Sequence, residues 1–214
     1  MDDGNIFHWA TTTVVKFCLK KNQEVSSTLF NEIIQYQNHI AAFESAYNYA
    51  TYQPRSELQV RNKLKLLKFD VSTINNTINK LKELHIIDDS EFCRKYVEAK
   101  LIKKTDSFKH IKYKLLALGV EEEIIDYTIM MVQDVYDDYL KVNGKEIISI
   151  KEVIIQNLIA KKLRLISSKP PQKQMQLTLN YLISKGFSYD EVKPHLLEIL
   201  NSKTNDNLSL ENEY

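Results

Sequence analysis

One apolar pattern occurs three times in this chain, and it restricts the possible folds more than any other feature of the sequence. The three copies align on Lys68, Gly119 and Gly186, with apolar residues four positions before each anchor and one, six, ten and thirteen positions after it. The aligned residues are Leu64, Phe69, Ile74, Ile78 and Leu81 in the first copy, Leu115, Val120, Ile125, Ile129 and Val132 in the second, and Leu182, Phe187, Val192, Leu196 and Ile199 in the third. In a chain with 43% apolar residues, chance agreement at every one of these positions is very improbable. We therefore interpret the pattern as a structural repeat.

The three anchors lie where one helix is expected to end and the next to begin. A residue in the left-handed conformation often closes a helix, and glycine adopts this conformation without a steric penalty because it has no Cβ. Two of the three anchors are glycine. Lys68 is the exception, and it would carry a strain of about 1 kcal/mol if it kept the same geometry.

Helical periodicity on both sides of each anchor sets the fold class. Apolar residues recur at the three- and four-residue spacing of a buried helix face, and only 4 Gly and 4 Pro leave little material for the turns of a β-rich fold. The sequence predicts an all-α fold of three tandem three-helix repeats in an elongated, curved array, stabilised by contacts between neighbours. Nine helices are expected in the repeats, over residues 39–52, 55–68, 71–84, 89–103, 106–118, 121–140, 150–166, 171–185 and 189–202.

The same alignment divides the chain into segments. We place repeat 1 at residues 38–87, repeat 2 at 88–140 and repeat 3 at 141–202. Residues 1–37 would form an N-terminal extension, in which a run of β-branched residues at 11–15 favours a short strand or extended segment. A separate helix is expected there from about residue 28 to 37. The polar residues 203–214 are expected to form a disordered tail.

Several residues suit structural roles at helix ends and in the core. Pro54 and Ser56 lie where the second helix of repeat 1 should start. Asp88 or Asp89 would cap the first helix of repeat 2, because a carboxylate accepts a hydrogen bond from an unpaired backbone N–H and suits the helix dipole. The residues that this helix turns inward are Phe92, Tyr96 and Val97.

Charged residues are segregated along the chain, although the net charge is only +1. Residues 53–118 carry 15 Lys and Arg against 8 Asp and Glu, and residues 141–200 carry 10 against 5. The residues between them, 119–140, contain 7 Asp and Glu and no Lys or Arg. Alternating basic and acidic blocks favour a surface that a partner recognises. Any single block is equally consistent with a solvated helix face.

No motif for catalysis or metal binding is evident in the sequence. The five histidines are scattered, and no two have the spacing of metal ligands on a helix. His85, Asp88, Asp89 and Cys93 can be drawn as a metal site, but consecutive aspartates at a helix start are far more often caps. A glycine-rich phosphate loop and a nucleophile motif are also absent. We therefore predict a protein that is not an enzyme and needs neither cofactor nor metal.

The sequence also favours a cytoplasmic location. It has no apolar run long enough to span a membrane, and its first residues are acidic where a signal peptide would be basic. The two cysteines, Cys18 and Cys93, lie far apart and imply no disulfide framework.

Several of these motifs together resemble the RecX family, which regulates the RecA recombinase. The similar segments are Pro54-Arg55-Ser56, Val60, Lys63-Leu64 and Ile87-Asp88-Asp89-x-x-Phe92-Cys93-x-x-Tyr96-Val97 in repeat 1 and its junction, Ile111, Lys114-Leu115 and Leu118-Gly119-Val120 in repeat 2, and Lys185-Gly186-Phe187-Ser188-Tyr189 in repeat 3. The likeness covers residues 38–200. Lys68 departs from it, because the family usually has glycine there.

The resemblance implies a function as well as a fold. Members of this family are built as tandem three-helix repeats and bind the RecA filament, usually limiting recombination and ATP hydrolysis during DNA repair and the SOS response. For this chain the resemblance implies a monomer that lies along a filament groove and contacts more than one protomer.

Cations on the polar sides of the helices are the candidate partner-binding residues. They are Arg55, Arg61, Lys63, Lys65, Arg94, Lys95, Lys109, Lys112, Lys114, Lys161, Lys162 and Arg164. Such side chains suit an acidic protein groove, or the phosphates of single- or double-stranded DNA. A DNA-binding protein whose three-helix units resemble a helix-turn-helix is one alternative, and a helical scaffold with neither partner is another. Phosphate contacts would weaken steeply with salt.

Overall fold

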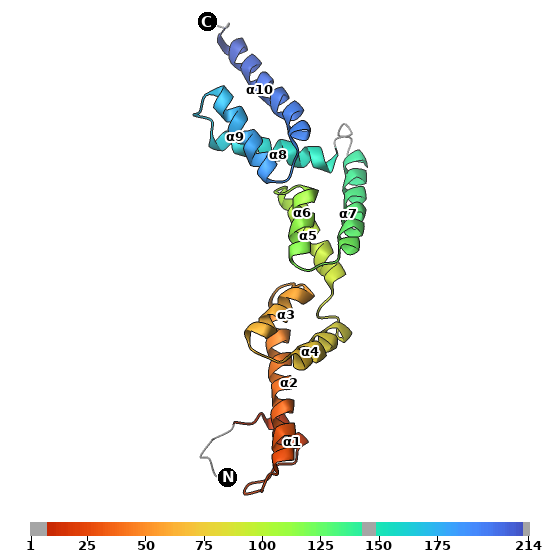
Figure 1. The fold of residues 1–214 in the computed structure, drawn as a ribbon. Helices are drawn as coiled ribbons and strands as arrows, with labels where there is room; N and C mark the ends of the chain where they lie inside the picture. Colours follow the sequence, from red (N-terminus) through yellow and green to blue (C-terminus); the bar gives the residue numbers. More distant parts are fainter. Residues whose placement is uncertain (1–7, 143–148, 212–214) are drawn as a thin grey trace. The chain divides into compact units, whose positions relative to one another are not determined.

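The α-helix is the only regular secondary structure in the part of the chain that the structure describes. The computed structural model describes residues 8–142 and 149–211, and the surroundings of side chains over 8–138 and 149–200. Within these residues there are ten α-helices and no strand, which confirms the predicted all-α fold (Figure 1). The chain divides into two compact units, one up to Asp89 and the other from Ser90 onwards.

The first unit is built on one long helix. It contains α1 (Thr11–Lys16), α2 (Ser27–Tyr52), α3 (Glu57–Leu66) and α4 (Val71–Glu83). Helix α2 packs against the other three, and α3 also packs against α4 (Figure 1). The core lies where the C-terminal half of α2 meets α3 and α4. Its buried residues are Ala42, Ala46, Ala50, Val60, Leu64, Ile74, Ile78, Leu81 and Ile87.

The second unit combines the helices of repeats 2 and 3. These are α5 (Asp89–Lys103), which begins at the boundary, α6 (Phe108–Ala117), α7 (Glu122–Val142), α8 (Ile150–Leu165), α9 (Pro171–Ser184) and α10 (Tyr189–Glu211). One hydrophobic core runs through both repeats, from Phe92 on α5 to Leu196 on α10. Helix α8 contributes six buried residues to it. The two repeats therefore fold as one body.

The three anchors of the sequence repeat all have positive φ. The values are 64° at Lys68, 82° at Gly119 and 89° at Gly186. At each anchor the backbone N–H bonds to the carbonyl three residues before it, at 2.9 Å, and the next N–H bonds to the carbonyl five residues before its own position. This pair of bonds is the Schellman motif, in which a left-handed residue closes a helix. The apolar positions four before and one after each anchor are the pair that packs across this turn.

Burial of the aligned apolar residues supports the repeat. All of them are buried except Phe69, Ile129 and Ile199, and these three are partly buried against the cores. His85 closes α4 by the same two backbone bonds at a φ of 54°. This further left-handed turn was not predicted, because nothing in the sequence marks a histidine at that position.

Capping explains where two neighbouring helices begin. The Oγ atom of Ser56 accepts a hydrogen bond from the backbone N–H of Gln59 at 3.4 Å, and the Gln59 side chain accepts one from the Ser56 N–H at 3.1 Å. This is a capping box, and it confirms that Ser56 starts α3. Pro54 precedes it as an exposed residue.

Asp88 directly precedes α5, whereas the Oδ1 atom of Asp89 accepts the Glu57 N–H at 2.8 Å. Asp89 therefore caps α3, and of the two aspartates predicted as the cap of α5, Asp88 is the one that precedes that helix.

The N-terminal segment differs from the prediction. Residues 11–16 form helix α1 instead of a strand, because contacts with α2 override the weak preference of β-branched residues. Thr13 is fully buried and its hydroxyl donates to Gln37 Oε1 at 2.5 Å, while the Lys16 ammonium lies 3.7 Å from the centre of the Tyr36 ring. The two helices expected around residues 28–37 and 39–52 form the single helix α2, since no Gly or Pro interrupts them.

The last helix is longer than expected. Helix α10 continues to Glu211, whereas the sequence predicted its end near 202 and disorder beyond. No glycine or proline follows Pro194 in the chain to stop the helix. The final three residues, 212–214, lie outside the described residues.

Replacing Lys68 with glycine should relieve backbone strain. Its left-handed φ disfavours a side chain, whereas the greater entropy of glycine in the unfolded chain offsets part of the gain. We expect Lys68→Gly to raise the free energy of unfolding by zero to about 1 kcal/mol, and Gly119→Val to lower it. Thermal melts of the two variants and the parent test this, and the opposite order would contradict the assigned geometry.

A second change tests the packing at Gly186. An added Cβ would lie 2.5 Å from Ser107 Oγ and 3.0 Å from His110 Cβ, so Gly186→Ala adds a steric conflict to the strain of a positive φ. Gly119→Ala supplies a control at an exposed left-handed position. We expect Gly186→Ala to lower the urea midpoint more than Gly119→Ala. Equal midpoints would mean that the turn moves away from α6 freely.

Candidate interaction surfaces

Three of the four predicted cations of repeat 1 contact other side chains of the first unit. Arg61 pairs with Glu57 at 2.5 Å and donates to Asn75 Oδ1 at 2.7 Å, so it links α3 to α4. The Arg55 guanidinium lies 4.3 Å from the centre of the Tyr49 ring, and the Lys63 ammonium lies 6.0 Å from it. These contacts hold three of the four cations against the protein.

Glu57 concentrates charge at the start of α3. Besides Arg61, it pairs with Lys82 at the end of α4. Burial opposes ionisation of Glu57, but hydrogen bonds and charge from Lys82 and Arg61 lower its pKa below the usual value. Burial raises the pKa of Asp89, although its bond from the Glu57 N–H acts against that shift. Arg61 and Lys82 therefore stabilise this helix junction.

Four of the five predicted cations of repeat 2 are also paired, and Lys109 is the exception. Arg94 forms ion pairs with Glu91 and Glu98, and Lys95 pairs with Glu91, all on α5. Lys112 pairs with Asp126 at 2.6 Å and with Glu122 at 2.7 Å, so it links α6 to α7. Exposed pairs along one helix are worth only about 0.5 kcal/mol each. They leave the cations of α5 less free to bind an anion.

A buried aspartate gathers cations from three parts of the second unit. Asp106, whose side chain is 2% exposed, lies 3.4 Å from the Nζ atoms of Lys100 and Lys114 and 3.6 Å from that of Lys185. His110 Nε2 lies 3.7 Å away, and Thr105 Oγ1 donates to Asp106 Oδ2 at 2.9 Å. Because Lys185 comes from repeat 3, this Asp106 cluster ties the two repeats together.

The Asp106 cluster shifts the pKa of both titrating members. Burial acts to raise the pKa of Asp106, but the Thr105 hydrogen bond and the three ammonium groups hold it below the usual value. Burial lowers the pKa of His110, and the nearby Lys114 charge lowers it further. One carboxylate faces three ammonium groups, so the cluster keeps an excess of positive charge.

The remaining predicted cations belong mainly to repeat 3. The Lys162 ammonium lies 5.3 Å from the centre of the Tyr181 ring, and Lys185 approaches the same ring at 5.8 Å. Four of the twelve predicted cations are exposed and form no ion pair or ring contact within the described residues. They are Lys65 on α3, Lys109 on α6, and Lys161 and Arg164 on α8.

Sequence reasoning missed Lys100, Lys185 and Asp106. Lys185 directly precedes the anchor Gly186, but nothing in the sequence indicates that the turn at the end of α9 lies against α6. The backbone N–H of Ser107 donates to the Lys185 carbonyl at 3.2 Å, which fixes that approach. Only the folded unit brings the three residues together.

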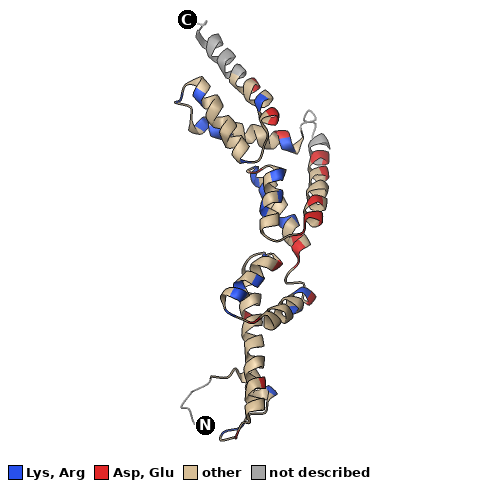
Figure 2. Cartoon of the chain, in the orientation of Figure 1, with Lys and Arg blue, Asp and Glu red and all other residues tan. Residues whose placement is uncertain are grey.

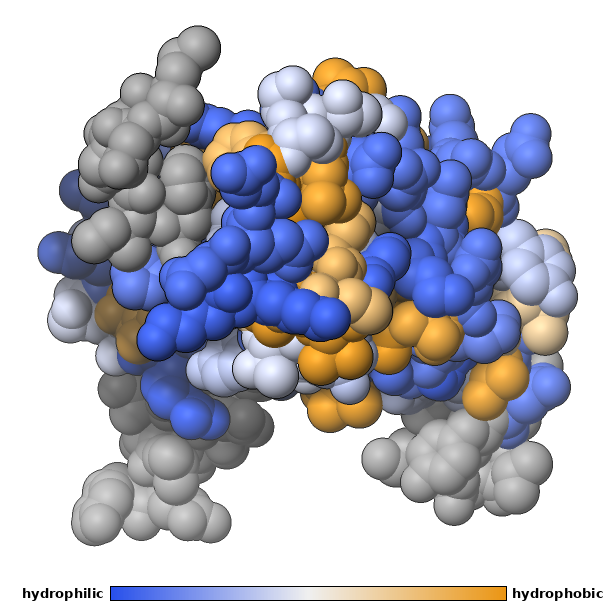
Figure 3. Space-filling model, turned by 90° about the horizontal axis from the view of Figure 1, so that it is seen from below, coloured by the Kyte–Doolittle hydropathy of each residue, from blue (hydrophilic) through white to orange (hydrophobic). Residues whose placement is uncertain are grey.

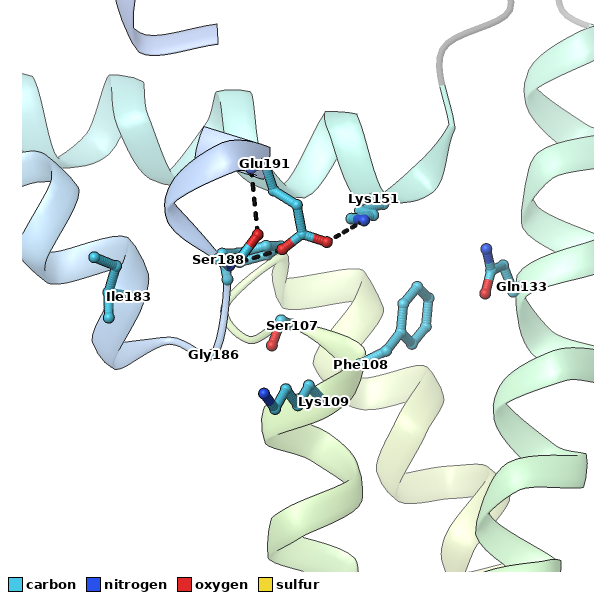
Figure 4. Close-up of a pocket in the computed structure, with 10 residues that line it drawn as sticks. Ser107, Phe108, Lys109, Gln133, Lys151, Ile183, Gly186, Ser188 and Glu191 are labelled. Atoms are coloured by element: carbon cyan, nitrogen blue, oxygen red, sulfur yellow. Dashed lines mark hydrogen bonds and ion pairs between the residues drawn. The ribbon is translucent and has the colours of Figure 1, made fainter. Parts of the chain in front are cut away.

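One cavity lies within the second unit, beside the same turn. It has a volume of about 570 Å³, and Figure 4 shows it between α6, α7, α8 and the start of α10. Glu191 pairs with Lys151 across it and accepts a hydrogen bond from the Ser188 N–H at 2.7 Å. Lys109 is the remaining charged residue of the lining. The lining holds no pair of groups arranged as acid and base or as nucleophile and base.

Over the described part of the chain, no group of three His, Cys, Asp or Glu side chains is placed to hold a metal ion. None of the helices described here is long and apolar enough to cross a membrane.

Comparison with known proteins gives a consistent result. Residues 42–81 match the family model of the first three-helix domain of RecX. The chain is 28% identical to "Regulatory protein RecX" of Clostridium beijerinckii over 190 residues, which are 88% of this chain and 82% of that protein. It is 26% identical over 208 residues to the protein of the same name from Clostridium botulinum (strain Eklund 17B / Type B), covering 96% of this chain and 91% of the relative.

Two crystal structures share the fold. One, described as regulatory protein RecX, has a TM-score of 0.65 and 21% identity over 90% of each chain. RecX from Lactobacillus salivarius has a TM-score of 0.57 and 24% identity, over 75% of this chain and 96% of that one.

Neutralising Asp106 should destabilise the second unit. Asp106→Asn leaves three ammonium groups close together without their anion, and we expect the free energy of unfolding to fall by about 1–3 kcal/mol at pH 7. The pKa values of Asp106 and His110 are both lowered by folding, so the unfolded chain binds more protons. Stability should therefore decrease as pH falls below 6.5 and again below 3.8, the ordinary values of the two groups.

Urea unfolding across that pH range measures both effects. Asp134→Asn, at an exposed carboxylate, is the matched control and should leave the urea midpoint nearly unchanged. An Asp106→Asn midpoint equal to that of the parent at pH 7 would show that the cluster contributes no stability.

Proposed function

Because this chain belongs to the RecX family of regulatory proteins, we propose that it binds the filament of the RecA recombinase and restrains recombination and ATP hydrolysis. The observation that carries the proposal is the distribution of the exposed cations that form no ion pair or ring contact within the described residues. We call them the uncommitted cations. Lys65, Lys109 and Lys161 lie on α3, α6 and α8, one helix from each repeat. Their positive charge suits an acidic partner, such as a protein filament on DNA.

The remaining charges support the same choice of cations. Arg61, Arg94, Lys95, Lys112 and Lys114 already pair with acidic groups of the chain. Recruiting them to a partner would break those pairs. The exposed cations without such partners can bind an external anion without that loss. The proposal places the protein in the cytoplasm, where RecA acts on DNA, as a monomer without cofactor.

Direct binding to DNA is the second candidate function. The observation that favours it is the excess of positive charge around Asp106, beside the ring of Tyr181. Lysines near an aromatic ring suit the phosphates and bases of a single strand. Phosphate contacts would make the affinity fall steeply with salt, whereas a protein interface with buried apolar anchors would lose less.

A titration separates the two functions. The protein is added to RecA filaments on single-stranded DNA while ATP hydrolysis is followed, and its binding to the same DNA without RecA is measured at matched salt. Suppression of hydrolysis at concentrations that leave naked DNA unbound supports the proposal. Equal affinity for naked DNA and for the filament favours the second candidate.

Removing one uncommitted cation from each repeat should weaken regulation. We expect Lys65→Ala, Lys109→Ala and Lys161→Ala together to reduce suppression of ATP hydrolysis several-fold. Stability should change by no more than about 1 kcal/mol, because all three side chains are exposed. The control removes three cations that pair along single helices, by Lys80→Ala, Arg94→Ala and Lys95→Ala. If both triple variants suppress hydrolysis like the parent, the cations are merely solvated.

A further inference from the structure

The outward side of α7 carries apolar and acidic residues in two adjacent rows. Residues four apart on a helix are neighbours on its surface, and eight exposed residues follow this spacing. The first row is Glu123, Tyr127, Met131 and Val135, and the second is Asp126, Met130, Asp134 and Asp138. Figure 2 shows acidic residues spread along α7. We call these eight residues the α7 face.

The apolar members of the α7 face are not needed by the core. Helix α7 already buries Ile125, Thr128 and Val132 on its opposite side. Exposed fractions are 63% at Tyr127, 51% at Met130, 44% at Met131 and 65% at Val135. Apolar residues among hydrophilic ones are common on protein surfaces, and Figure 3 shows such residues in orange on the face seen from below. Four within three helical turns on one face instead indicate an interaction site.

The charge of the α7 face indicates the kind of partner. Residues 119–140 contain no Lys or Arg, and the Lys112 ammonium at the edge of the face is held by Asp126 and Glu122. Asp137, beside the face, is also engaged, because its Oδ1 atom accepts the Ile150 N–H at 2.9 Å. Glu123 and Asp134 form no ion pair with any described residue. Uncompensated carboxylates repel DNA phosphates and attract lysine and arginine.

We propose that the α7 face docks a protein surface on which lysine or arginine side chains surround apolar pockets. Tyrosine is a frequent anchor of such interfaces, and methionine adapts its shape to irregular pockets. The inference rests on the proposed function, and it assigns α7 to the protein protomers of the RecA filament rather than to its DNA. The cations on α3, α6 and α8 are not part of this face.

Two variants of the full chain test this surface. Glu123→Lys with Asp134→Lys reverses the charge, and Tyr127→Gln with Met131→Gln removes two anchors while keeping good helix formers. Glu32→Lys with Glu198→Lys is the control, since it makes the same charge change at exposed residues of α2 and α10. Binding of each labelled protein is measured to RecA filaments on single-stranded DNA held with a slowly hydrolysed ATP analogue, and to the DNA alone. Sedimentation measures self-association.

The expected result is a loss of at least ten-fold in filament affinity for both α7 variants and a change under three-fold for the control. Affinity of the α7 variants for naked DNA should stay equal or rise. Filament affinities equal to the parent would overturn the α7 proposal and leave the proposed function standing. Self-association of the parent that only the α7 variants lose would also overturn it, in favour of a second copy as occupant. If the parent itself does not bind the filament, the proposed function fails and this inference fails with it.

Discussion

The left-handed turn that closes the second helix of each repeat is the constraint on which the rest of the structure depends. At Lys68, Gly119 and Gly186 the same two backbone hydrogen bonds end the helix and send the chain into the next one. The turn places an apolar pair on its inner side, so the following helix enters the core in a fixed register. At Gly186 it also lies against α6, where there is no space for a Cβ. That contact brings Lys185 to Asp106 and joins repeats 2 and 3 in one unit.

Much of this architecture could be predicted from the sequence, because the turn leaves a regular apolar signature. The repeat, the helix type and most helix ends followed from it. The failures came where distant contacts override local preference. Residues 11–16 form a helix because Thr13 and Lys16 contact α2, and Asp89 caps α3 because the chain returns to it after α4. The candidate site was harder to predict, since a lysine in a sequence does not reveal its partner. Arg61 and Lys112 link helices, whereas Lys65 and Lys109 remain exposed.

Many charged side chains of this protein stabilise its own fold, and the two candidate binding surfaces carry charges of opposite sign. The acidic residues Glu57 and Asp106 are each surrounded by cations and stabilise helix junctions. Among the described residues, Lys65, Lys109, Lys161 and Arg164 on α3, α6 and α8 form no ion pair, and Glu123 and Asp134 lie unpaired beside exposed apolar residues on α7. A filament of protein on DNA presents acidic phosphates as well as protein surfaces of either sign. If the proposed function holds, surfaces of both signs favour the filament over DNA alone, because the carboxylates of α7 repel DNA phosphates.

Hydrogen exchange measured by mass spectrometry tests most directly whether both surfaces meet the filament. Amide exchange of the parent is compared when it is free, with single-stranded DNA, and with RecA filaments on that DNA. The account predicts slower exchange in both α6 and the exposed turns of α7 with the filament, and unchanged exchange in α7 with DNA alone. Exchange in α7 that the filament leaves unchanged, or that naked DNA slows equally, would contradict it.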